Sequence, residues 1–268
     1  MSLPLICVTL TGCTVDEMVK DAARATAVGA DIVEVRLDKL WVVEQEIDAT
    51  EKVKSDSDDN RKSVYTPPEF ISQPMDSVDL ESSLISFRTG IELPVILTCR
   101  PERQGGYFPG SEKERIEVLT KAISSGVSWI DLETDIESKE RKKLVKLAGD
   151  STKIISSNHY DQSPGSSNEI IEEIDEISNS GDIIKIVFNT SGKKDALKLF
   201  DVAWRTRDSE DKLSIMGIGA GGDWTRIHAP LLNQSMVYTT MENGWYLAQQ
   251  GRINTSDLKT AWKLLEYN

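Results

Sequence analysis

The segment Asp182-Ile-Ile-Lys-Ile-Val-Phe188 has the apolar, β-branched composition of a buried strand, and a lysine stands in its middle. Side chains alternate along a strand, so Lys185 shares a face with Ile183 and Val187. Removing an ammonium group from water is costly, so a buried lysine should have a lowered pKa and can form a Schiff base with a carbonyl. A structural lysine, either with its head in solvent or paired with a buried carboxylate, remains the alternative from this strand alone.

Segments of similar composition recur along the chain and alternate with helical patterns. Strands are predicted at residues 3–10, 31–38, 94–100, 128–134, 152–158, 182–188, 213–219 and 235–241. Helices are predicted at residues 14–29, 80–91, 111–125, 138–148, 168–179, 193–207, 224–233 and 255–266. Continuous apolar strands between helices are typical of a parallel sheet covered by helices. Eight such units predict a closed (β/α)8 TIM barrel, one domain over residues 1–268, rather than an open doubly wound sheet.

The composition limits the classes of partner. A formal net charge of −13 disfavours nucleic acid and anionic membranes, and we find no apolar run long enough to span a membrane. Three cysteines without CxxC spacing predict free thiols in a cytoplasmic protein. The two histidines form no metal-binding motif, so we expect no metal, and no nucleotide motif is present. Residues 44–62 are acidic and rich in Ser and Lys, and we interpret them as a surface insertion.

Polar residues gather where the predicted strands end, which is the functional end of such barrels. They are Glu34, Arg36, Asp38, Arg100, Asp131, Glu133, His159, Lys185, Asn189 and Arg226. Each alone has a structural alternative, such as a buried Glu34–Arg36 pair, a hydrogen-bonded His159 or surface arginines. Together they predict a site for a small, anionic, hydroxylated ketone, because arginines clamp carboxylates and histidine transfers protons near neutral pH.

Three motifs in this order resemble the type I 3-dehydroquinate dehydratase family. They are Gly29-Ala-Asp-Ile-Val-Glu-Val-Arg-Leu-Asp38, Leu97-Thr-Cys-Arg-Pro101 followed by Gln104-Gly-Gly106, and Gly181-Asp-Ile-Ile-Lys-Ile186. The resemblance covers nearly the whole chain. It implies a hydro-lyase of the shikimate pathway of aromatic amino-acid biosynthesis, which converts 3-dehydroquinate to 3-dehydroshikimate and water. It also implies a lysine Schiff base, no cofactor, a small-molecule substrate as partner and a homodimer.

The resemblance also implies a role for individual residues. Lys185 would form the imine with the substrate ketone, and His159 would donate and accept protons. Arg226 matches the family's arginine that binds the substrate carboxylate. Further substrate contacts are implied for Glu34, Arg36, Arg100, Gln104 and Arg252.

Several positions depart from the family pattern. In Asn158-His159-Tyr160 the asparagine and histidine look transposed, and an ungapped register counted from Lys185 puts Asn158 at the histidine position. A one-residue slip restores His159. Gln104 stands where many members have glutamate, and Ala248-Gln-Gln-Gly-Arg252 replaces the family's Ser-Ala-Pro-Gly-Gln lid. Two alternatives therefore stay open: another Schiff-base barrel enzyme of the class I aldolase type, or a non-catalytic relative that binds a metabolite of the pathway.

Overall fold

The barrel strands succeed one another around a single sheet. We describe the protein from a computed structural model, which covers residues 3–45, 68–244 and 246–267. The strands are β1 (Leu5–Thr9), β2 (Ile32–Arg36), β5 (Val95–Thr98), β6 (Trp129–Glu133), β7 (Lys153–Tyr160), β8 (Ile183–Ser191), β9 (Leu213–Ala220) and β10 (Met236–Thr239). Their order is β10-β1-β2-β5-β6-β7-β8-β9, and each hydrogen-bonded pair is parallel. Between β9 and β10, the Ser235 amide donates to the Leu213 carbonyl at 2.8 Å, which helps to close the ring.

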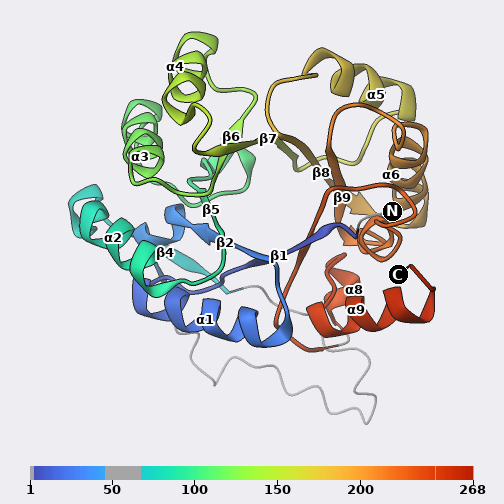
Figure 1. The fold of residues 1–268 in the computed structure, drawn as a ribbon, viewed down its shortest axis with the longest axis horizontal. Coiled ribbons are helices and arrows are strands. Elements are labelled where there is room, and N and C mark those ends of the chain that lie inside the picture. The colour runs from blue at the N-terminus through green and yellow to red at the C-terminus, as the bar shows by residue number, and fades with distance from the viewer. Residues whose placement is uncertain (1–2, 46–67, 245, 268) are drawn as a thin grey trace.

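The helices form a layer around these strands (Figure 1). They are α1 (Val15–Val28), α2 (Leu80–Gly90), α3 (Glu112–Ser124), α4 (Ser138–Ala148), α5 (Ser167–Glu176), α6 (Lys193–Arg205), α7 (Trp224–Ile227), α8 (Tyr246–Gln249) and α9 (Thr255–Leu264). Thr14 and Ser111 start α1 and α3 with capping boxes, which satisfy amide groups of the first turn. The predicted (β/α)8 barrel is confirmed. No helix in the described ranges is long and apolar enough to cross a membrane.

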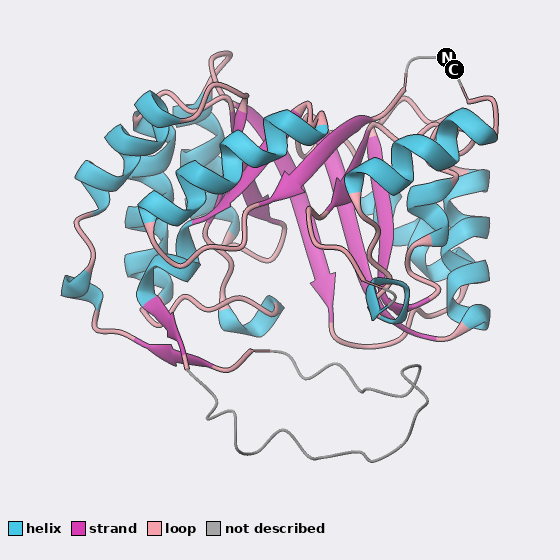
Figure 2. Ribbon diagram, turned by 90° about the horizontal axis from the view of Figure 1, so that it is seen from below, coloured by secondary structure: helices cyan, strands magenta, loops and turns pink. Residues whose placement is uncertain are grey.

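A small antiparallel sheet of β3 (Val42–Glu44) and β4 (Phe70–Ser72) is added to the barrel. Figure 2 shows it at the end toward which the barrel strands point. The predicted insertion at residues 44–62 lies outside the described residues from position 46 onward.

Several predicted elements end earlier than expected, and the structure shows the reason for two of them. Leu37 and Asp38 are not the end of a strand but part of a 3-10 turn, η1 (Leu37–Trp41). The Asp38 carboxylate accepts hydrogen bonds from the backbone amides of Arg100 and Tyr107, and this contact holds the chain in its turn. The helix predicted over 224–233 ends at Ile227, because Pro230 has no amide hydrogen and disfavours a helical residue before it.

The two faces of β8 belong to different parts of the core. Ile184, Ile186 and Phe188 pack in one apolar cluster with residues of α6, outside the ring of strands. Ile183 and Val187 belong to the apolar cluster inside the barrel. Lys185 shares a face with Ile183 and Val187, as the alternation of side chains predicts, and the structure shows that this face points into the barrel.

The packing behind β8 should depend on the inner face of α6. Leu199 is fully buried, whereas Leu197 on the same helix is 57% exposed. We expect Leu199→Ala to lower the free energy of unfolding by about 2–5 kcal/mol, because it leaves a cavity. Leu197→Ala should change it by no more than about 0.5 kcal/mol. Urea unfolding followed by circular dichroism measures both, and equal losses in the two variants would contradict this packing.

Candidate active site

A cavity of about 530 Å³ opens at the C-terminal end of the barrel strands. The eight residues to which the family resemblance gave a role all line it: Glu34, Arg36, Arg100, Gln104, His159, Lys185, Arg226 and Arg252. Of the other polar residues predicted at strand ends, Asn189 lines it too, whereas Asp38, Asp131 and Glu133 are not among its lining residues. They come from different strands and from the loops that follow them. The barrel therefore brings together side chains that are far apart in the sequence.

Lys185 is both buried and paired. Its side chain is 4% exposed, and Nζ lies 3.5 Å from Glu34 Oε1 and 3.5 Å from Asp131 Oδ2. Nζ also lies 3.8 Å from the centre of the Tyr238 ring. The sequence left open whether Lys185 is a buried reactive amine or a structural lysine paired with a buried carboxylate. In the structure it is both buried and paired. At 3.5 Å neither carboxylate makes a short hydrogen bond to the amine.

Glu34 is held as a carboxylate below the cavity opening. Its oxygens accept hydrogen bonds from the hydroxyls of Thr9 at 2.8 Å and Thr98 at 3.0 Å. Burial alone would raise the pKa of Glu34, but the charges of Lys185 and Arg36 bring it below its usual value. An ionised carboxylate therefore lies next to the amine.

Arg100 connects the buried carboxylates beneath the cavity. Its Nη1 donates to Glu133 at 2.7 Å and to Ser157 at 2.8 Å, and its Nη2 donates to Asp131 at 2.8 Å. Glu133 also accepts a hydrogen bond from Arg115 at 2.6 Å. Burial would raise the pKa of Asp131, but Arg100 and Lys185 lower it. Arg100 thus lines the cavity while its terminal nitrogens are bonded to protein groups.

Arg36 has a fixed orientation at the cavity wall. Its Nε and Nη2 donate to the two oxygens of Asp38 at 2.9 and 2.6 Å. A bidentate pair of this kind fixes the plane of the guanidinium group. The group therefore lies ready for a further contact on its remaining side.

Arg226 differs from the other arginines of the cavity. Its Nε donates to the Tyr238 carbonyl at 2.9 Å, and Nη1 donates to the carbonyls of Gly217, Gly222 and Gly251 at 2.6–2.7 Å. In the described part of the chain, no carboxylate lies within ion-pair distance of it. Burial lowers the pKa of Arg226 to about 10. This buried positive charge is solvated by carbonyl dipoles and forms no ion pair with a described residue, so an anion entering the cavity would be attracted to it.

The structure distinguishes His159 from Asn158. In the β7–β8 ladder Ser157 pairs with Lys185 and His159 pairs with Val187, so His159 lies on the inner face and lines the cavity. Asn158 lies on the outer face, where it donates to Glu173 at 2.8 Å. Of the two placements considered from the sequence, the one-residue slip is the one whose residue lines the cavity. His159, not Asn158, faces the lysine side of the barrel.

His159 is held by its backbone rather than by its ring. Its amide donates to Gln104 Oε1 at 3.1 Å, whereas its buried Nδ1 has no hydrogen-bond partner among the described residues. Burial and the nearby charges of Arg100 and Lys185 hold the pKa of His159 well below 6.5. The imidazole is therefore neutral near pH 7, the state in which it accepts a proton.

The chain is similar to known proteins in sequence and in fold. A family model described as type I 3-dehydroquinase matches residues 6–268. The chain belongs to this family. A 3-dehydroquinate dehydratase of Methanosarcina barkeri is 28% identical over 251 residues, 91% of this chain and 88% of the relative. That of Methanopyrus kandleri is 26% identical over 262 residues, 97% of this chain and 100% of the relative.

Solved structures of the family share the fold. The crystal structure of 3-dehydroquinate dehydratase from Geobacillus kaustophilus has a TM-score of 0.76 at 19% identity and covers 99% of this chain and 92% of that one. The type I enzyme from Clostridium difficile, solved with covalent modified comenic acid, has a TM-score of 0.73 at 20% identity and covers 98% and 92%. Type I 3-dehydroquinases are hydro-lyases of the shikimate pathway that act through a Schiff base, and this chain is one of them by sequence and by fold.

The segment Ala248–Arg252 was expected from the resemblance to differ from the family's lid, and the structure shows the contacts that Arg252 makes there. Arg252 Nη2 donates to Thr240 Oγ1 at 3.1 Å and to Glu242 Oε1 at 3.2 Å, and Nη1 donates to Gln250 Oε1 at 3.2 Å. The extra charge is thus partly neutralised within the same loop. Arg226 also binds the Gly251 carbonyl, so the lid is tied to the buried guanidinium.

The loop that carries Gln104 explains the Gly-Gly pair of this type I 3-dehydroquinase. Gly105 has a positive φ of 73°. A Cβ on Gly106 would lie 2.0 Å from the Arg100 carbonyl oxygen, so a side chain does not fit there. The loop therefore packs closely against Arg100, two residues after the end of β5, and this brings Gln104 to the His159 amide.

Sequence reasoning did not assign every residue that shapes the site. Asp131 and Glu133 were noted on one strand face, and the pairing of both with Arg100 emerges only from the folded barrel. Their signal was two carboxylates, two residues apart, on an otherwise apolar strand. Tyr238 was not singled out, because an aromatic residue in a strand is ordinary for the core.

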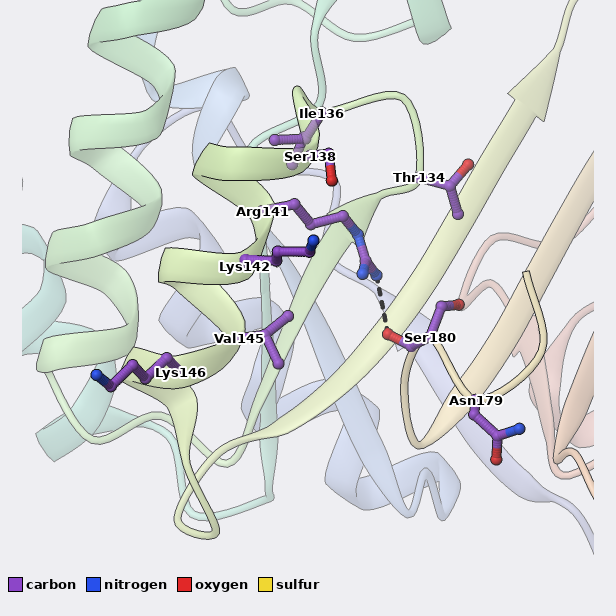
Figure 3. A pocket seen from close by; sticks show the side chains of 9 residues that line it. All are labelled: Thr134, Ile136, Ser138, Arg141, Lys142, Val145, Lys146, Asn179 and Ser180. Atoms are coloured by element: carbon purple, nitrogen blue, oxygen red, sulfur yellow. Dashed lines mark hydrogen bonds between the residues drawn. The ribbon is translucent and has the colours of Figure 1, made fainter. Parts of the chain in front are cut away.

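A second hollow of about 410 Å³ lies outside the barrel beside α4 (Figure 3). Its residues include none of the predicted site residues. Arg141, which points across it, donates to the Ser180 carbonyl at 3.0 Å and to Ser156 Oγ, so it connects α4 to β7 and to the loop before β8. We therefore assign the chemistry to the barrel cavity and a structural role to this arginine.

The state of His159 can be checked directly, because the chain has only two histidines. We expect the imidazole of His159 to stay neutral as the pH falls through 6.5, since burial and neighbouring cations oppose its protonation. Nitrogen NMR of labelled histidine measures this, and His228→Gln identifies the signal. The unfolded chain does bind a proton near pH 6.5, so this shift also removes stability as the pH falls below that value. A midpoint for His159 at or above 6.5 would contradict the electrostatics described here.

Proposed function

We propose that this chain dehydrates 3-dehydroquinate to 3-dehydroshikimate through an imine on Lys185, with His159 as the proton donor and acceptor. The observation that carries the proposal is the buried Lys185 amine at the functional end of the barrel, within one cavity with His159 and Arg226. Family membership and the dehydratase relatives support the reaction. The assignment of roles to single residues is our own.

The steps follow from the groups present. The Lys185 ammonium group transfers a proton to neutral His159, and the resulting amine attacks the substrate ketone. His159 returns the proton to the hydroxyl of the adduct, which leaves as water. The protonated imine that remains draws electrons from the adjacent carbon. Neutral His159 removes a proton from that carbon. It then returns the proton to the departing hydroxyl, which leaves as water. Hydrolysis of the imine with a second water molecule restores the lysine and releases the product.

The cavity's charges suggest how the substrate is oriented. Arg226 takes the carboxylate, because it is a buried cation whose described contacts are all to carbonyl groups. Glu34 and Arg36 contact the hydroxyls on the opposite wall. Arg100 holds Asp131 and Glu133 in place at the base of the site. Gln104 and Arg252 contribute from the flanking loop and the lid.

Two rivals differ in products rather than in fold. An aldolase-type Schiff-base enzyme is favoured by the altered lid at Arg252, since lid contacts select the substrate. A non-catalytic metabolite binder is favoured by the same departure. Against both stand the dehydratase relatives and the complete set of Lys185, His159 and Arg226 in one cavity.

Reductive trapping tests the proposal. Borohydride added together with 3-dehydroquinate should leave a covalent adduct on the Lys185 peptide, seen by mass spectrometry, while Lys185→Met gives none. Without reductant, 3-dehydroshikimate should accumulate and be detected by its ultraviolet absorbance. Cleavage of a carbon–carbon bond would indicate the aldolase type. Measured binding without any adduct would indicate the metabolite binder.

A pair of neighbouring variants tests the proton-transfer residue. We expect His159→Ala to lower kcat by about 10²–10⁴-fold, because general acid–base catalysis contributes that much. Asn158→Ala, on the outer face of the same strand, should lower it only slightly. Steady-state kinetics with confirmed folding of both proteins measures the difference. The reverse order of effects would mean that His159 is not the proton-transfer residue.

We also infer a cytoplasmic homodimer. The described cysteines, Cys7, Cys13 and Cys99, are unpaired, which fits a reducing compartment. The dimer rests on the family resemblance, and exposed apolar side chains on α6, Leu197 and Trp204, offer one surface for it.

A further inference from the structure

Tyr238 on β10 occupies an unusual position in the cavity. Its side chain is mostly buried, at 8% exposure, and it lines the same cavity as Lys185. Lys185 Nζ stands 3.8 Å from the centre of its ring, which is within the range of a cation–π contact. The sequence pattern did not single out this residue, and the proposed mechanism assigns it no role.

The ring, not the hydroxyl, carries the interaction. The buried Tyr238 hydroxyl has no hydrogen-bond partner among the described residues. A buried tyrosine hydroxyl normally finds such a partner, and leaving it without one is unfavourable. The hydroxyl therefore does not explain why an aromatic residue stands beside the lysine. The negative face of the ring does.

The reaction places a positive charge on the nitrogen over that ring. The imine attracts electrons from the neighbouring carbon only while its nitrogen is protonated. Glu34 and Asp131, each 3.5 Å from Nζ, attract the charge but are also bases that can take the proton. An aromatic face attracts the charge and has no lone pair to accept the proton.

On the basis of the proposed function, we propose that the face of Tyr238 is a further catalytic element, which keeps the imine on Lys185 protonated during the elimination. Lys185 and Tyr238 are both buried, and a cation–π contact is stronger where its partners are removed from water. Its contact with the reacting nitrogen is direct. The ligand it recognises is the cationic imine itself.

The other groups near the nitrogen stay constant in the test. Besides Tyr238, the titratable and charged groups that act on Lys185 or lie beside it are Glu34 on β2, Asp131 on β6, Cys7 on β1, His159 on β7, and the arginines 36 and 100. None of them is altered by a change at position 238. A shift of the pH profile then reports on the ring.

The experiment varies the negative charge on the face of the aromatic ring at position 238 and measures the pH dependence of kcat. Tyr238→Phe keeps the aromatic face and loses only the unpartnered hydroxyl, so its kcat–pH profile should stay within about a quarter of a pH unit of the natural protein. Phenylalanines carrying one to five ring fluorines at this position weaken and then reverse the negative face. The alkaline limb of kcat should move step by step to lower pH, by about one unit in total. Tyr238→Leu should show a shift of similar size where it folds.

The outcomes separate the inference from the proposed function. An alkaline limb that does not move with fluorination, in proteins that still form the trapped Lys185 adduct, overturns the role of Tyr238 and leaves the dehydratase intact. Absence of the adduct in the natural protein overturns the proposed function itself. A large shift in Tyr238→Phe would assign the effect to the hydroxyl and also overturn the inference.

Discussion

The buried ammonium group of Lys185 is the constraint on which the rest of the site depends. A charge inside the barrel must be compensated, so Glu34 and Asp131 lie next to it, and Asp131 in turn requires Arg100. Removing one member of such a network leaves an uncompensated charge and costs about 3–5 kcal/mol. The alternation of cations and carboxylates continues through Glu133 to Arg115, which is fully buried on α3. Stability and chemistry therefore rest on the same atoms.

The barrel interior is divided along its axis. Cys7, Ile32, Ile155 and Ile183 belong to the apolar cluster inside the ring of strands. Glu34 and Lys185 follow two residues after Ile32 and Ile183 on the same strands, toward their C-terminal ends. Because these side chains are carried by hydrogen-bonded strands, their positions are far more constrained than positions on loops. Arg252, by contrast, lies in a loop between α8 and α9.

The electrostatics of the cavity oppose those of the chain as a whole. The protein carries a formal charge of −13, yet its cavity is lined by four arginines and two lysines. Among the described residues, no carboxylate forms an ion pair with Arg226. Carbonyl groups of the β9 and lid turns surround its guanidinium group. A cation held only by dipoles favours an anionic ligand, and this suits the carboxylate of the substrate class. The pKa of His159 is lowered by its burial in this cavity and by the nearby charges of Arg100 and Lys185.

The sequence by itself determined the eight-unit barrel, because buried parallel strands must be continuous apolar runs. It also determined that Lys185 shares a face with Ile183 and Val187, because strand side chains alternate. It also named eight residues that line the cavity, although it gave no role to Tyr238. Only the tertiary structure showed that His159, and not Asn158, faces the cavity. A one-residue slip reverses the face of every side chain, and the ladder with β8 sets the register. The tertiary structure alone showed that Arg100 is bonded to Asp131 and Glu133 and that Tyr238 lies over the amine. Such pairings join strands far apart in the chain, and no local pattern specifies them.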